Sequence, residues 1–161
     1  MARQFSMPYQ IPPVDLLAPA ADAAGRTSLY RSLKNAHKAY VVVKLTQGNA
    51  ATVLLSILQA TAVAGTGSKA VTAMPIWSNL DTSLSDSLVV RTPAANYTTD
   101  AAVKNKIVVF EITPESCLDT TNGFDCIALS TGASNAANTT EATLFIYQAY
   151  QGASAPSSYT D

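Results

Sequence analysis

The stretches that decide the fold are AYVVVKL at residues 39–45 and KIVVFEI at residues 106–112. Both are short and rich in β-branched residues, which lose rotamer freedom in a helix but pack well on a pleated sheet. They predict strands over 39–46 and 106–113. Similar short apolar runs recur along the chain and predict six further strands, near residues 28–33, 52–59, 69–73, 87–92, 124–130 and 142–150.

Residues that favour tight turns separate these runs. Gly and Asn, which tolerate positive φ, occur in QGN at 47–49, in GTGS at 65–68 and in NG at 122–123. Eight short strands punctuated in this way are typical of an antiparallel β-sandwich. The sequence therefore predicts an all-β, jelly-roll-like sandwich, with an immunoglobulin-like sandwich as the alternative.

Two segments are less clear. Leu29, Leu33 and Ala36 have a spacing that also suits a helix, although strand and turn are favoured over 29–39. A single helical turn is expected over 99–104, because Thr99 or Asp100 could serve as its N-cap.

The first 27 residues contain four prolines, at positions 8, 12, 13 and 19, so a continuous helix or a central strand is excluded there. We interpret residues 1–27 as an extended docking arm, 28–151 as the sandwich domain and 152–161 as a flexible tail. The arm is too apolar for a solvated linker, which suggests that it lies on a protein surface. The residues expected to dock are Met7, Tyr9, Ile11, Pro12, Pro13, Val14, Leu16 and Leu17.

The composition favours a protein that assembles with others. Of the 161 residues, 48% are hydrophobic but only 13% are charged, about half the usual share of soluble proteins. Small neutral side chains must then cover the surface, as they do at interface centres. Residues 1–44 contain six basic and two acidic side chains, a balance of +4, whereas the rest contains four basic and nine acidic ones, a balance of −5. This asymmetry could let the arm dock on an acidic neighbour or on the body of a second copy.

Several partners and compartments have little support. The sequence has no basic run interleaved with aromatics, so we do not expect nucleic-acid binding. It has neither the apolar stretch of about 18–20 residues that a membrane helix needs nor the apolar core of a signal peptide, so we expect a cytoplasmic origin and no membrane.

Catalytic, metal and cofactor sites are not expected either. His37 is the single histidine, which leaves no set for zinc or copper, and we interpret it as a polar turn residue. The GTGSK segment lacks the spacing of a phosphate-binding loop. Asp119, Asn122 and Asp125 could offer oxygens to calcium, but Asx turns explain them better.

Two further features remain open. Cys117 and Cys126 flank a turn-rich loop, and a disulfide between them is possible, although a reducing compartment favours thiols. Trp77 could line an aromatic cleft with Tyr40, Tyr97 or Tyr147, but a core or interface anchor is the simpler interpretation.

Several phrases of the chain are familiar. They are SLKNA at 32–36, YVVV at 40–43, QGNAATV at 47–53, QATAVAGTGSKA at 59–70, TDAAVKNK at 99–106, NGFDCI at 122–127 and STGASNAAN at 130–138. In these phrases the sequence resembles small structural proteins of tailed-bacteriophage virions. The resemblance implies a decoration (cement) protein that is trimeric, binds across subunits of the major capsid protein on the outer surface of the head, and is assembled in the bacterial cytoplasm. The alternatives are a tail, spike or baseplate module and a glycan-binding or hydrolytic sandwich.

Overall fold

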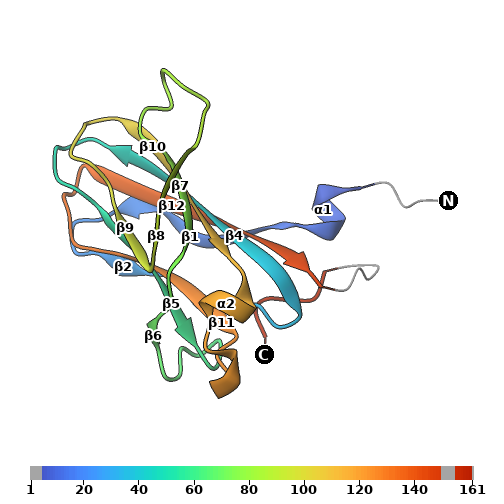
Figure 1. Ribbon diagram of the computed structural model, residues 1–161. Coiled ribbons are helices and arrows are strands. Elements are labelled where there is room, and N and C mark those ends of the chain that lie inside the picture. The colour runs from blue at the N-terminus through green and yellow to red at the C-terminus, as the bar shows by residue number, and fades with distance from the viewer. Residues whose placement is uncertain (1–4, 150–154, 161) are drawn as a thin grey trace.

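The structure, a computed structural model, describes residues 5–149 and 155–160 and is almost entirely β (Figure 1). Its strands are β1 (Pro13–Ala21), β2 (Arg26–Thr27), β3 (Arg31–Ser32), β4 (Ala36–Gln47), β5 (Leu54–Ala60), β6 (Lys69–Ala70), β7 (Met74–Asn79), β8 (Val89–Ala94), β9 (Asn96–Thr98), β10 (Asn105–Ile112), β11 (Cys126–Thr131) and β12 (Asn138–Gln148). The short helices are α1 (Met7–Gln10), α2 (Pro114–Cys117) and the 3₁₀ turn η1 (Thr120–Asn122).

The strands form two antiparallel sheets. Sheet A has the order β1-β12-β4-β10-β7-β8, and sheet B has the order β2-β11-β5-β6, with β3 also on β11 and β9 also on β5. Within this arrangement the pairs are nested: β2 and β3 pair with β11, β4 with β10, β5 with β9, and β7 with β8. Such nesting is the winding of a jelly roll. The all-β, jelly-roll-like prediction is therefore confirmed, and the immunoglobulin-like alternative is not adopted.

The core lies between the two sheets because side chains alternate between the faces of each strand. On β4 the buried inward positions include Val41, Val43 and Leu45, and on β10 they include Val108 and Phe110. Apolar side chains of β5 and β11 close the core from sheet B.

The predicted arm is wrong from residue 13 onward. Strand β1 pairs with β12 at the edge of sheet A, and β2 pairs with β11, so residues 13–27 belong largely to the body. Edge pairing accommodates the prolines of β1, which cannot donate to a ladder on both sides. A register irregularity between Asp15 and Leu17 allows the adjacent Leu16 and Leu17 both to be buried. Of the described residues, 5–12 remain as a projecting arm.

A buried carboxylate fastens this part of the chain to the body. Asp22, which is 0% exposed, accepts hydrogen bonds from the hydroxyls of Thr131 on β11, at 2.8 Å, and of Thr140 on β12. Its carboxylate also accepts a bond from Nε of Arg26 at 3.3 Å. The guanidinium of Arg26 donates in turn to the carbonyls of Ala18, Ala20 and Thr140. The turn between β1 and β2 is therefore tied to both sheets.

Each of the eight predicted strands overlaps an observed strand, although the bounds differ. The segment 29–39 is strand and turn, with Asn35 at a φ of 63° in the turn. The helical turn expected at 99–104 is absent from these described residues, and a short helix instead begins at Pro114, where proline suits the first helical position. Strands β1, β2, β7 and β9 were not predicted. In β7, Pro75 lies between the two positions where the pairing with β8 shifts register. Because proline is disfavoured in strands, residue preferences alone did not predict this strand.

Candidate docking surface

The outward face of sheet A carries an apolar strip across its central strands. Tyr40 and Val42 of β4, Ile107 and Val109 of β10, and Phe145 of β12 occupy outward, half-buried positions. Register places Val109 beside Val42, and Tyr40 beside Phe145. We call this strip of five residues the trough. Trp77 of β7 continues it, because Trp77 pairs with Val109 and is also half-buried.

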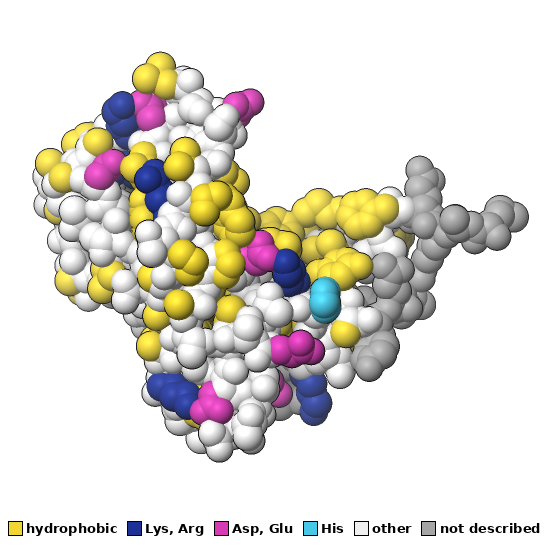
Figure 2. All heavy atoms as spheres, in the orientation of Figure 1, with side chains coloured by type: hydrophobic (Ala, Val, Ile, Leu, Met, Phe, Trp, Pro, Cys, Tyr) yellow, Lys and Arg dark blue, Asp and Glu magenta, His cyan; other side chains and the backbone are white. Residues whose placement is uncertain are grey.

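The projecting N-terminal segment forms one wall of the trough. Phe5, Met7 and Ile11 face Tyr40, Val42, Val109 and Phe145 across a depression of about 370 Å³. In Figure 1 this segment leaves the body at the end of the long strands β4 and β12. Hydrophobic side chains gather around the hollow between this extension and the main body (Figure 2). Helix α1 has no buried residue, so the segment lines the depression without filling it.

The loop between β7 and β8 forms the other wall. A second depression of about 510 Å³ lies between this loop, through Leu88 and Asp86 among others, and the sheet residues Val42, Ile107 and Val109. Both depressions contain Val42 and Val109, so they are parts of one surface. The rim beyond them is also apolar: Leu84 in the loop is 82% exposed and Val90 on β8 is 67% exposed. Such a concentration of exposed apolar side chains marks an interaction site.

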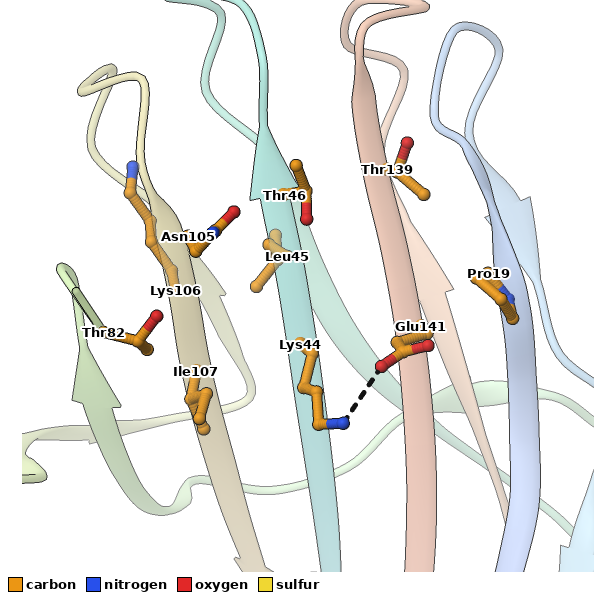
Figure 3. A pocket seen from close by; sticks show the side chains of 10 residues that line it. All are labelled: Pro19, Lys44, Leu45, Thr46, Thr82, Asn105, Lys106, Ile107, Thr139 and Glu141. Atoms are coloured by element: carbon orange, nitrogen blue, oxygen red, sulfur yellow. Dashed lines mark ion pairs between the residues drawn. The ribbon is translucent and has the colours of Figure 1, made fainter. Parts of the chain in front are cut away.

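The far end of the same face is polar. A third depression of about 330 Å³ is lined across β10, β4, β12 and β1 by Lys44, Thr46, Asn105, Thr139 and Glu141, among others (Figure 3). Lys44 and Glu141 form an ion pair with an N–O distance of 3.2 Å. The polar end therefore bounds the trough along the strand direction.

A second ion pair bounds the trough near the arm. Lys38 donates to the carboxylate of Glu111, and this hydrogen bond raises the pKa of Lys38 above its ordinary value. Both side chains lie on the trough side of their strands, and each charge is compensated by the other. Next to them, the ring of His37 meets Tyr147 edge-on, with the centroids 6.0 Å apart. His37 is thus an exposed residue of β4 and not the turn residue that was predicted.

Three ion pairs hold loops elsewhere. The pKa of Asp81 is lowered mainly by its hydrogen bond from Lys104, that of Asp100 by its bond from Lys106, and that of Asp119 by its bond from Lys69. Lys106 is fully buried and also donates to Oε1 of Gln47 at 2.7 Å. These pairs compensate three acidic side chains outside the trough.

The predicted docking residues fall into two groups. Met7 and Tyr9 are exposed on α1, and Ile11 and Pro12 are half-buried beside it, so this part of the prediction is compatible with a docking role. Pro13 is exposed at the start of β1, whereas Val14 packs against the core. Leu16 and Leu17 are buried core residues, so they cannot dock on a partner, and their assignment is wrong.

Cys117 and Cys126 are both buried and are not joined by a disulfide. Cys117 belongs to the core between the sheets. On β11 the neighbouring Ile127 and Leu129 point into that core, so Cys126 points to the opposite side of sheet B. The two sulfurs are thus on different sides of one sheet.

The described residues contain no group of three or more His, Cys, Asp or Glu side chains placed to hold a metal ion. Around the predicted calcium candidates, Asp119 is paired with Lys69 at 2.5 Å and accepts two bonds from Asn122, as expected of a turn. Trp77 and Tyr40 share the outward face of sheet A, as one pairing of the aromatic-cleft alternative requires, whereas Tyr97 packs against the core.

Sequence reasoning missed the trough itself, although a signal for it exists. In YVVV and IVVF every position is apolar, whereas a sheet with one wet face alternates apolar and polar residues. Continuous apolar runs in antiparallel strands indicate that both faces are to be covered.

Comparisons with known proteins add little. No protein-family model matches the chain, and no curated protein matches it. Among solved structures, the chain is similar to the crystal structure of SPBc2 prophage-derived protein YomS, with a TM-score of 0.45, 7% identity, and coverage of 83% of this chain and 90% of that one. We base no conclusion about function on this likeness. No helix among the described residues is long and apolar enough to cross a membrane.

Proposed function

We propose that this chain is a non-enzymatic structural protein of a bacteriophage virion, a capsid decoration (cement) protein that stabilises the head by binding across major capsid protein subunits. It would act as an oligomer, with a trimer favoured, on the outer surface of the capsid. The observation that carries the proposal is the apolar trough, open between the projecting segment and the β7–β8 loop on an otherwise weakly charged surface.

The physical case is one of burial and repetition. Each Å² of apolar surface removed from water contributes about 25 cal/mol, and a half-buried trough with exposed apolar rims has surface left to bury. On a particle the same contact repeats many times, so a modest gain per copy opposes separation of the whole shell. The sequence resemblance to virion structural proteins supplies the kind of particle.

The test is stoichiometry on purified particles. Particles from the source lysate are banded on a density gradient, and this chain is quantified against the major shell protein by mass spectrometry. Near-equimolar amounts support a decoration protein. A few copies per particle would favour the tail, spike or baseplate alternative, and complete absence would defeat the virion proposal.

A further inference from the structure

We propose that the trough receives the N-terminal segment of a second copy of this chain, so that copies are linked by exchange of arms. The inference goes beyond the proposed function, since it concerns assembly of the purified protein and does not require a particle. It rests on three observations about the trough and the arm: shape, apolar chemistry and charge.

The shape of the trough selects a narrow partner. Its floor is the outward face of β4 and β10, and it is walled by Phe5 to Ile11 on one side and by the β7–β8 loop on the other. A narrow segment laid between the two walls would contact the floor and both walls. An extended or single-turn segment is of this kind, and apolar grooves commonly bind such segments.

The chemistry of the arm matches the trough. Phe5, Met7 and Tyr9 are 65%, 42% and 68% exposed, and α1 has no buried residue. These large apolar side chains are therefore not buried against the body from which they project. In the same chain they leave the two depressions of about 370 and 510 Å³ open. Each copy thus presents both an unburied apolar segment and an unfilled apolar trough.

Charge favours the same pairing. The trough is flanked by Asp86, which makes no ion pair with another described residue, while Lys38–Glu111 and Lys44–Glu141 are already paired. The sequence ahead of α1 carries Arg3 and no acid. A basic, apolar segment entering a trough with an acidic rim is electrostatically matched. The net charge of −1 gives copies little mutual repulsion.

Such a contact is heterologous, because different surfaces of the two copies meet. Heterologous contacts generate closed rings when the rotation closes, and open chains otherwise. Each copy then donates one arm and accepts one arm. This predicts that a copy without a working arm can still bind a copy without a working trough, because each supplies the part that the other lacks.

The experiment uses light scattering after size exclusion on purified full-length protein and four variants. The variants are Tyr9→Lys, which places a charge on the arm without changing a residue that lines either depression, Val109→Lys, which places a charge on the floor of the trough, and Leu88→Lys, which places a charge on its wall and is used if Val109→Lys does not fold. The control is Leu29→Lys, since Leu29 is 70% exposed and lies outside the trough. Circular dichroism checks folding of each.

We expect the full-length protein and Leu29→Lys to have masses of at least twice the 16.8 kDa of one chain. Tyr9→Lys and the trough variant should each be monomeric. Mixed in equal amounts, they should form a one-to-one complex that grows no further, because only one arm and one trough remain intact. A monomeric full-length protein, a Tyr9→Lys variant that keeps the full-length mass, or a mixture that stays monomeric would each overturn arm exchange. None of these results bears on whether the chain is found on particles, so the two proposals fail separately.

Discussion

Replacing Asp22 with alanine tests whether the β1–β2 segment is part of the folded body. Asp22 is wholly buried, and its carboxylate accepts bonds from the hydroxyls of Thr131 and Thr140 and from Arg26. Alanine would remove the acceptor and leave the Thr140 hydroxyl without this partner in a site where the whole residue is 0% exposed. The guanidinium of Arg26 would keep its three backbone carbonyls.

The magnitude follows from these contacts. Each hydrogen bond from a buried hydroxyl to a charged acceptor contributes about 1.5–3 kcal/mol, and two such bonds are lost. The Arg26 pair adds little, because that side chain is partly exposed. Relief of the carboxylate's own desolvation offsets part of the loss. We expect Asp22→Ala to lower the free energy of unfolding by about 3–5 kcal/mol, the usual cost of removing one partner from a buried ionic network.

Urea unfolding at neutral pH, followed by circular dichroism, measures this loss as a lower midpoint at an unchanged slope. The matched control is Asp86→Ala, an exposed aspartate, for which a change within about 0.5 kcal/mol is expected. A loss below about 1 kcal/mol for Asp22→Ala would refute the reasoning, because β1 would then contribute little to the body.

Three further predictions concern the arm, one turn and acid. Deleting residues 1–11 should change the free energy of unfolding by less than about 1 kcal/mol when copies are kept dilute, because α1 has no buried residue. Deleting residues 1–21 should instead prevent cooperative unfolding, since it removes β1 and two buried leucines. Thermal melts compare the two deletions, and equal melts would contradict a boundary between arm and body near residue 13. Gly25→Ala should destabilise the protein in the same melts, because Gly25 has a φ of +72° and a Cβ there would lie 2.6 Å from a backbone carbonyl oxygen of β11. The three loop aspartates paired with lysines have pKa values below the value of about 3.9 of an unfolded chain, so their contribution is complete above that pH and is lost as the pH falls through their folded pKa values. Urea unfolding should therefore give a lower free energy at pH 3 than at pH 6, and equal values at the two would count against these pairs.

The fold class could be predicted because the decisive signals are local. Runs such as YVVV and IVVF specify strands, and the glycines between them specify turns, so an antiparallel sandwich follows. The role of residues 13–27 could not be predicted in this way. Prolines at 13 and 19 exclude a central strand but permit an edge strand, and only the pairing with β12 decides between an edge strand and a free arm.

The candidate site depends on relations that no local pattern contains. Val42 and Val109 are 67 positions apart in the sequence, yet they are direct neighbours across β4 and β10. Likewise, the spacing of Cys117 and Cys126 along the chain permits a disulfide. The structure separates them because Cys117 lies in the core, whereas the side chain of Cys126 on β11 points away from it. Spacing along the chain limits which contacts can form, but strand register and facing determine which ones do.

The strongest argument that the trough is covered in use comes from the change of residue type along the same two strands. At their polar end the outward positions are Lys44, Thr46 and Asn105, as expected of a face in contact with water. Further along, the outward positions become Val42 and Val109, while the inward positions beside them, Val41, Val43, Val108 and Phe110, are apolar. Folding of the single chain does not require valine at these outward positions, since polar residues serve the adjacent ones. The boundary between the two types coincides with the edge of the trough, which is the expected pattern where a partner segment begins.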